Sequence, residues 1–145
     1  MSIFLYACET WTLTAELQRR IEALEMKCYR RLLGISYTDH ITNESIRDTI
    51  TQHIGQHRDL LTVVKRRKLQ WYGHVTRSDG LSKTILQGTV EGGRRRGRQR
   101  NKWSDNVKEW TGMPFADSQV ACHNRQTWAE VVNSSAVQRP DDSDD

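Results

Sequence analysis

The sequence has no long hydrophobic run. No stretch of its 145 residues approaches the apolar length of a membrane span. The first residues have neither the basic lead nor the long apolar core of a signal peptide. The mean hydropathy of −0.76 is polar for a compact globule, so one large core is not expected. These features predict an intracellular chain with no membrane among its partners.

Cysteine is scarce. The three cysteines, Cys8, Cys28 and Cys122, are far apart and odd in number, which does not indicate a disulfide framework and fits a reducing compartment. A zinc site needs ligands in close pairs such as Cys-x-x-Cys. Only Cys122 and His123 are neighbours, and adjacent side chains on a helix point about 100° apart, which prevents them from binding one ion together.

Clustered carboxylates are missing as well. Catalysis by two metal ions needs two or three converging carboxylates, whereas the acidic residues here are scattered or gathered in the C-terminal tail. His53 and His57 stand four residues apart, but Gly55 separates them and no third ligand is evident. No hydroxyl or thiol has a recognisable partnered base. We expect no metal, no cofactor, no small-molecule substrate and no enzymatic centre.

The sequence is rich in positive charge over one segment. Residues 94–103 read Arg-Arg-Arg-Gly-Arg-Gln-Arg-Asn-Lys-Trp. A guanidinium stays charged at cellular pH and presents a planar set of donors that matches phosphate oxygens. From Arg58 to Lys102 there are thirteen basic and three acidic residues, a local balance of +10 in a chain of net charge +4. This polarised charge predicts RNA or DNA, bound through phosphates, as the partner.

Apolar periodicity predicts a mainly α fold, a small irregular assembly of about five helices with at most one short strand or hairpin. The first helix should begin after the N-cap Thr14 and end at Gly34. Its expected buried stripe is Leu17, Ile21, Leu24, Cys28, Leu32 and Ile35. Thr42 should cap a second helix that stops near Gly55, with Ile41 and Ile46 as a hydrophobic staple.

A third helix is expected from about Arg58, with one apolar face formed by Leu61, Val64, Trp71 or Tyr72, and Val75. Lys68 interrupts this face, and its stem can lie along apolar surface. Gly73 costs roughly 1 kcal/mol against Ala inside a helix. It therefore indicates close packing of another backbone or a helix end. A helix-turn-helix spacing is present but too common to imply base reading.

The C-terminal half is expected to be less regular. Asp79 and Gly80 predict a turn, and residues 87–91 are either a short strand or an extended arm. The Gly/Arg segment up to residue 100 should be irregular and flexible when unbound. Trp103, Val107 and Trp110 predict a fourth helix that Gly112 ends, with both tryptophans as core anchors rather than base platforms. The last helix should run from about Asp117, with Val120, Ala121, Trp128 and Val131 or Val132 as its apolar positions.

Six stretches, in this order and with similar gaps, resemble the C-terminal region of endonuclease–reverse transcriptase polyproteins of non-LTR retrotransposons. They are Leu5-Tyr6-Ala7-Cys8-Glu9-Thr10-Trp11; Leu24-Glu25-Met26-Lys27-Cys28-Tyr29-Arg30-Arg31-Leu32-Leu33-Gly34-Ile35; Thr42-Asn43; Arg66-Arg67-Lys68-Leu69-Gln70-Trp71-Tyr72-Gly73-His74-Val75; Leu86-Gln87-Gly88 with Val90-Glu91-Gly92; and Arg96-Gly97-Arg98-Gln99-Arg100 with Trp103, Asp105 and Trp110. The resemblance covers about residues 5–132. In that family this region follows the polymerase palm and holds primer–template or element RNA.

The resemblance implies a thumb-like, nucleic-acid-binding function without the palm or endonuclease motifs. Together with the patterns along the chain, it predicts an apolar N-terminal remnant (1–13) that looks like the end of something larger, a helical thumb-like domain (14–79), an Arg/Gly-rich basic arm (80–102), a C-terminal helical pair (103–133) and a disordered acidic tail (134–145). Gln99 replaces a proline that is common in the family, which weakens the likeness of the arginine segment to a minor-groove AT-hook. The missing polymerase core is a further expected partner.

The candidate nucleic-acid contacts combine the basic run with the residues that the resemblance implies. They are Lys65, Arg66, Arg67, Lys68, Trp71, Tyr72, His74, Arg94, Arg95, Arg96, Arg98, Arg100 and Lys102. The basic turn 65–68 and the arginine segment also suit nuclear-import signals, which places the chain in the nucleus. The alternative is a non-binding structural or interaction remnant of a degenerate retroelement, whose amphipathic helices have lost their partner.

Overall fold

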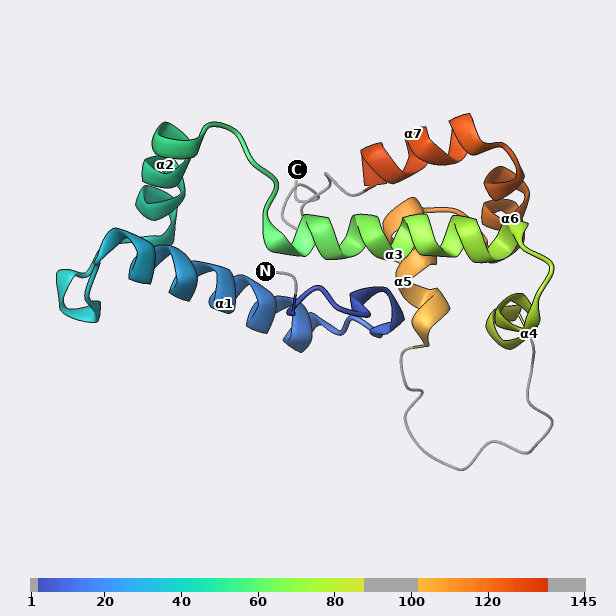
Figure 1. The fold of residues 1–145 in the computed structure, drawn as a ribbon, viewed down its shortest axis with the longest axis horizontal. Coiled ribbons are helices and arrows are strands. Elements are labelled where there is room, and N and C mark those ends of the chain that lie inside the picture. Colours follow the sequence, from blue (N-terminus) through green and yellow to red (C-terminus); the bar gives the residue numbers. More distant parts are fainter. Residues whose placement is uncertain (1–2, 88–101, 136–145) are drawn as a thin grey trace, which may run out of the picture. The chain divides into compact units, whose positions relative to one another are not determined.

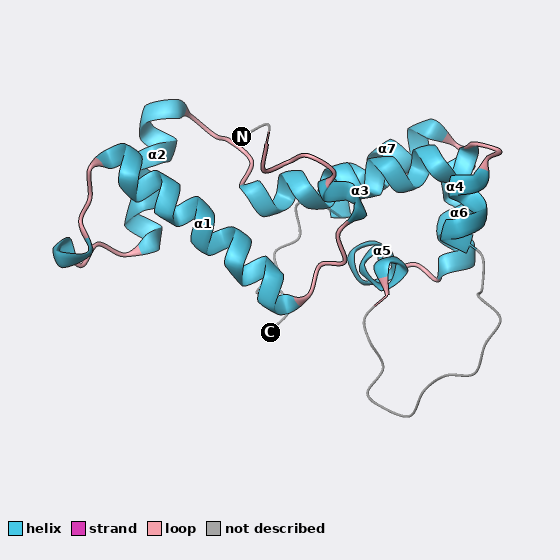
Figure 2. Ribbon diagram, turned by 60° about the horizontal axis from the view of Figure 1, so that its bottom comes forward, coloured by secondary structure: helices cyan, strands magenta, loops and turns pink. Residues whose placement is uncertain are grey.

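The computed structural model describes residues 3–87 and 102–135, and in this part of the chain loops join helices only, with no strand (Figures 1 and 2). Two short 3-10 helices, η1 (Cys8–Thr10) and η2 (Tyr37–Asp39), accompany seven α-helices: α1 (Ala15–Leu33), α2 (Asn43–Ile54), α3 (Leu60–Arg77), α4 (Leu81–Gln87), α5 (Trp103–Thr111), α6 (Phe115–His123) and α7 (Arg125–Ser135). The mainly α prediction is confirmed. Within the described ranges, no helix is long and apolar enough to cross a membrane.

Part of what the sequence predicted lies outside the described residues. The proposed strand or arm at 87–91 begins at Gln87, which belongs to α4, and positions 88–91 are not described. The arginine segment up to residue 100 and the acidic tail beyond residue 135 are also outside the described ranges.

The described residues form two compact units. Unit 1 contains residues 3–13, 64–87 and 102–135, and unit 2 contains Thr14–Val63. One boundary therefore falls inside α3, at Val64, rather than after the helix. The other boundary lies between Leu13 and Thr14, and it places the N-terminal segment in the same unit as the C-terminal helices.

In unit 2, α1 and α2 begin and end where the sequence predicts. The Oγ1 of Thr14 accepts the Leu17 N–H at 3.2 Å, and the Oγ1 of Thr42 accepts the Ser45 N–H at 3.3 Å, so each threonine satisfies an otherwise unpaired helix donor. Gly34 ends α1 in the left-handed conformation with φ 68°.

The buried face of α1 differs from the prediction. Ile21, Glu25 and Met26 are buried, whereas Leu24, Cys28 and Leu32 are exposed. Glu25 explains the difference because its Oε1 accepts the Leu60 N–H at 2.8 Å and the Tyr29 hydroxyl at 2.9 Å. A carboxylate at the N-terminus of α3 satisfies a free helix donor and the helix dipole, so the polar residue goes inside and its apolar neighbour faces solvent.

In unit 1, side-chain hydrogen bonds join α3 to α5, α6 and α7, and α7 lies alongside α3 in both views (Figures 1 and 2). Polar contacts join α3 to each neighbour, and α6 has two of them because the Arg77 Nη1 also donates to the Cys122 carbonyl at 2.7 Å. The Lys68 Nζ donates to the Asn106 Oδ1 on α5, the Tyr72 hydroxyl pairs with the Ser118 Oγ on α6, and the Trp128 Nε1 on α7 donates to the Leu69 carbonyl. Buried side chains of Val64, Leu69 and Val75 fill the space between these contacts.

The N-terminal segment is an integral part of unit 1. The Leu13 N–H and carbonyl both bind the Asn106 amide, at 2.8 and 2.7 Å, and the Trp103 Nε1 donates to the Glu9 carbonyl at 2.8 Å. Cys8 and Leu13 are 0% and 1% exposed. Packing inside this unit therefore accounts for Cys8 and Leu13, whereas Ile3 and Tyr6 are 94% and 83% exposed.

Gly73 lies within α3, and the close approach predicted there is made by a side chain. A Cβ on Gly73 would collide with the indole of Trp128, whose Nε1 is held by the Leu69 carbonyl at 3.0 Å. The prediction of a nearby backbone or a helix end is therefore replaced by an indole packed against an uninterrupted helix.

The predicted last helix is two helices, because Asn124 ends α6 and begins α7. Its Oδ1 accepts the N–H groups of Gln126 and Thr127 at 3.0 and 3.3 Å, a typical side-chain cap. The break changes which side chains are buried: Ser118 and Cys122 lie inside, while Val120 is 73% exposed.

Candidate nucleic-acid interface

The side of α3 that faces away from the core of unit 1 carries four of the predicted contacts. Arg67 and His74 are exposed, and Trp71 and Arg66 are partly exposed. Arg67, Trp71 and His74 follow the i, i+4, i+7 spacing of one helix face. The structure thus brings two guanidiniums, an indole and an imidazole onto one open side of a single helix.

Lys65, Lys68 and Tyr72 lie on the inner side of the same helix. Lys65 is 5% exposed, with its Nζ 5.5 Å from the centroid of the Trp110 ring, and Lys68 and Tyr72 are 0% exposed. The basic turn 65–68 therefore divides between inside and outside. These three side chains hold unit 1 together and do not belong to a surface that a nucleic acid can reach.

Lys68 has a complete set of internal partners. Its Nζ donates to the Trp11 carbonyl at 2.7 Å and to the Asn106 Oδ1 at 2.6 Å, and it lies 4.4 Å from the centroid of the Trp103 ring. Burial disfavours the ammonium form and lowers the pKa of Lys68 to about 7, although the charge of Glu109 acts in the opposite direction. With a pKa of about 7, this amine is therefore about half protonated inside the unit near neutral pH.

The outward cations of α3 are not neutralised by carboxylates of the described chain. The two ion pairs among the described residues are Arg20 with Glu16 and Lys83 with Asp79, and neither includes Arg66 or Arg67. Arg67 has two internal contacts, one from its Nη1 to the Leu5 carbonyl at 3.2 Å and one with the Cys8 side chain. Most of the donors on this guanidinium therefore remain available for an anion.

Lys102 is exposed and precedes α5 directly, and its backbone N–H is held by the Asp105 Oδ2 at 2.7 Å. The predicted contacts Arg94, Arg95, Arg96, Arg98 and Arg100 lie outside the described residues. The last described residue before them is Gln87, at the end of α4. Helices α4 and α5 therefore flank the arginine segment in the chain.

A groove between α4 and α5 was not predicted from the sequence. This α4–α5 groove has a volume of about 460 Å³ and is lined by Thr10, Trp71, Ser82, Ile85, Leu86, Lys102, Trp103 and Ser104. The apolar pair Ile85-Leu86 was visible in the sequence. Its proximity to Trp71 and Trp103 was not, because these residues come from three separate helices.

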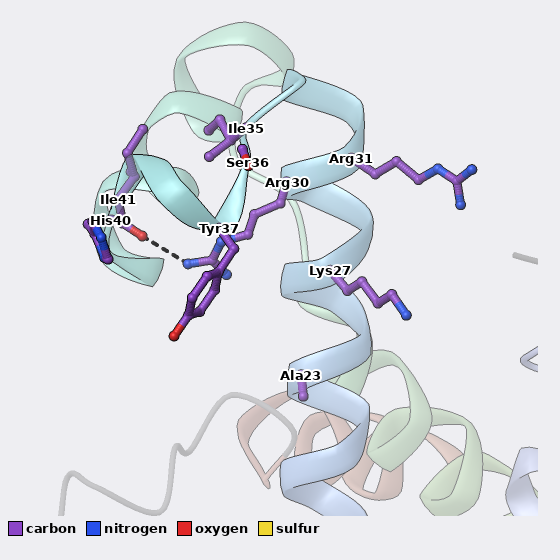
Figure 3. A pocket seen from close by; sticks show the side chains of 9 residues that line it. All are labelled: Ala23, Lys27, Arg30, Arg31, Ile35, Ser36, Tyr37, His40 and Ile41. Carbon is purple, nitrogen blue, oxygen red and sulfur yellow. Dashed lines mark hydrogen bonds between the residues drawn. The ribbon is translucent and has the colours of Figure 1, made fainter.

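Unit 2 has a second hollow, of about 670 Å³, beside the C-terminal turns of α1. It is lined by Ala23, Lys27, Arg30, Arg31, Ile35, Ser36, Tyr37, His40 and Ile41 (Figure 3). Arg30 is used internally, since its guanidinium donates to the Asn43 Oδ1 and the Ile41 carbonyl, both at 2.9 Å. In Figure 3 the Lys27 and Arg31 side chains extend away from Tyr37, so the cations do not converge on one point.

No group of three or more His, Cys, Asp or Glu that could hold a metal ion occurs within residues 3–87 and 102–135. His57 pairs with the Tyr29 hydroxyl at 2.8 Å, and His53 with the Thr49 carbonyl at 3.0 Å. Burial raises the pKa of the Cys122 thiol to about 12, so this cysteine stays protonated and is a poor ligand.

Comparison with known proteins finds a transposon-derived relative. The chain is 31% identical, over an alignment of 141 residues, to an uncharacterized transposon-derived protein of Caenorhabditis elegans. The chain is related to a transposon-derived protein. The alignment covers 91% of this chain and 50% of the relative, so the chain spans about half the length of that protein. No protein-family model and no solved structure matches the chain.

Proposed function

We propose that this chain binds RNA or DNA through phosphate groups, as the nucleic-acid-binding part of a transposon-encoded protein, without a catalytic centre of its own. The observation that carries the proposal is the open side of α3, where Arg67 and His74 are exposed, Arg66 is partly exposed, and no carboxylate of the described residues pairs with either arginine. The resemblance to the region after the palm of non-LTR reverse transcriptases favours primer–template or element RNA as the ligand, and the nucleus as the site of action.

The proposed interface is smaller than the set named from the sequence. Lys65, Lys68 and Tyr72 shape α3 from inside, and the contacts proposed for the surface are Arg66, Arg67, Trp71, His74 and Lys102 together with the five arginines of residues 94–100. Such binding depends on the release of counterions. The logarithm of the affinity should therefore fall with the logarithm of the salt concentration, by about 0.9 for each phosphate neutralised on duplex DNA.

The test is a titration of the full chain with labelled duplex DNA, RNA–DNA hybrid and single strands at low and at moderate salt. We expect binding at low salt that weakens steeply as salt increases. Replacing Arg94, Arg95, Arg96, Arg98 and Arg100 together by Ser should lower the affinity for all sequences and flatten the salt dependence. Absence of binding to every probe at low salt, or binding indifferent to salt, would overturn the proposal.

A docking role is the second candidate, and the exposed side of α4 favours it. Leu81 and Ile85, four residues apart, are 75% and 71% exposed. Two large apolar side chains on one face of a short helix are typical of a surface that another polypeptide covers, such as a polymerase core. The same titration separates the two candidates, because a docking remnant should bind no nucleic acid at low salt.

A further inference from the structure

We propose that the α4–α5 groove accepts one unstacked base of a single strand, with Trp71 as the stacking surface, so that the chain binds single-stranded nucleic acid more tightly than its phosphate contacts alone provide. This inference rests on the proposed nucleic-acid binding and specifies the form of the ligand. It assigns a binding function to Ile85, Leu86 and Trp103, which were not among the contacts named from the sequence.

The walls of the groove suit a planar apolar ring. Trp71 is partly exposed, Ile85 is 71% exposed, and the groove volume of about 460 Å³ can hold a nucleobase. The hydroxyls of Thr10, Ser82 and Ser104 also line it and offer donors and acceptors to the edge of a base. Apolar faces combined with a few hydroxyls favour a base over a purely aliphatic ligand.

The aromatic platform is fixed before any ligand arrives. The rings of Trp71 and Trp103 meet edge to face, with centroids 5.4 Å apart and planes at 71°. The Trp103 Nε1 is bound to the Glu9 carbonyl, and the Lys68 Nζ lies 4.4 Å from the centre of the same ring. Because these contacts already restrict the rings, little conformational entropy is lost when a base stacks on them.

The nearby charge identifies the ligand as a nucleotide in a strand. Arg67 lies four residues before Trp71 on α3, so a guanidinium and an indole are neighbours on the same helix face. Lys102 is exposed and lines the groove itself. A nucleotide joins a planar ring to an anion through one sugar, which matches an aromatic surface flanked by cations. Bases within a duplex are stacked on each other and cannot enter.

The experiment compares two labelled probes that carry the same number of phosphates, an oligothymidylate and an abasic strand of equal length, with the full chain at low salt. We expect the base-containing strand to bind roughly fivefold or more tightly, the difference that stacking of one base provides. Trp71→Ala should remove this difference and leave the affinity for the abasic strand unchanged.

Because Trp71 is partly buried, its replacement could also disturb the fold, so a second variant changes an exposed residue of the groove instead. Ile85→Ser alters a side chain that is 71% exposed and should also reduce the preference for the base-containing strand. The control is Ile54→Ser, at a 64% exposed position on α2 outside the groove, and it should leave that preference unchanged. Equal binding of both probes, or a preference that survives Ile85→Ser in a folded chain, overturns the groove assignment while phosphate binding stands. Failure of both probes to bind overturns the proposed function as well.

Discussion

The Lys68 ammonium lies 2.6 Å from the side-chain oxygen of Asn106, and both residues are buried. The same oxygen accepts the Leu13 N–H, and the amide nitrogen of Asn106 donates to the Leu13 carbonyl. One amide therefore joins α3, α5 and the N-terminal segment. A buried network in which each partner is satisfied fixes one arrangement of the elements, and removing any member leaves the others unpaired.

The burial of Lys68 should give unit 1 a pH-dependent stability. With a folded pKa of about 7 and an ordinary value of 10.5, only the unfolded chain keeps this proton between those pH values. The free energy of unfolding should therefore rise with pH above 7, by at most about 1.4 kcal/mol per pH unit. Cys122 acts in the opposite direction above pH 9, because burial raises its pKa to about 12.

The measurement is chemical denaturation of the wild type and of Lys68→Met between pH 7 and pH 9, below the range in which Cys122 contributes. The variant should lose the rise in stability, and Lys102→Met, which alters an exposed lysine, should keep it. Parallel pH profiles for wild type and Lys68→Met would show that Lys68 stays charged in the folded state.

Gly73→Ala should destabilise unit 1 even though alanine is the better helix former. The added methyl meets the indole of Trp128, which the hydrogen bond to the Leu69 carbonyl holds in place. Overpacking of this kind typically costs about 1–3 kcal/mol or more, which outweighs a gain of roughly 1 kcal/mol in helix propensity. Thermal unfolding should show a lower midpoint. Gly80→Ala, where a Cβ has nothing within 4 Å, is the matched control and should be near neutral.

Glu25→Ala should loosen the start of α3. The change removes the acceptor of the buried Leu60 N–H, at a cost of about 1–3 kcal/mol for a buried donor left unpaired, while the Tyr29 hydroxyl keeps its contact with His57. Hydrogen exchange at the Leu60 amide should accelerate. Glu25→Gln, which keeps an oxygen in place, should have a smaller effect. Unchanged exchange in the alanine variant would mean that another group caps this helix.

The double variant Arg66→Gln and Arg67→Gln should weaken binding to duplex and single strands alike. Each lost phosphate contact should reduce the slope of log affinity against log salt by about 0.9 on duplex DNA. The control is Arg19→Gln with Arg58→Gln, which removes the same charge from exposed positions in unit 2. If both double variants lose affinity equally, net charge rather than the α3 surface governs binding. Circular dichroism should confirm that both remain helical.

Helix ends were predictable because their causes are local in the sequence. Thr14 and Thr42 cap the helices that follow them, and Gly34 and Gly112 end α1 and α5 in left-handed conformations. Each of these features depends on a few consecutive residues. The exception is Asn124, whose side chain begins a helix where apolar spacing alone predicted continuity.

Burial was harder to predict because it depends on contacts between distant residues. Leu24 appears more suitable for a core than Glu25, until Leu60, thirty-five residues away, supplies an N–H that needs an acceptor. Lys68 was expected to place only its stem on apolar surface, yet the Trp11 carbonyl and Asn106 accommodate the whole side chain. No periodicity in α1 or α3 contains this information.

The candidate site was predictable in its chemistry and only partly in its geometry. A run of four basic residues on a helix must place some of them outside, but the sequence does not say which, and the structure selects Arg66 and Arg67. The α4–α5 groove brings together residues from η1, α3, α4 and α5, so it could be found only once these elements had been placed.

The participation of residues 3–13 in unit 1 limits how the chain can be shortened. A shortened chain that starts at Thr14 would keep the whole first long helix, because Thr14 is the N-cap of α1. This shortened chain would remove the Leu13 carbonyl from the Asn106 amide and the Trp11 carbonyl from the Lys68 amine. It would also remove the Glu9 carbonyl that accepts the indole N–H of Trp103. Trimming thirteen residues from one end would thus disorganise helices that lie some fifty to one hundred positions further along the chain.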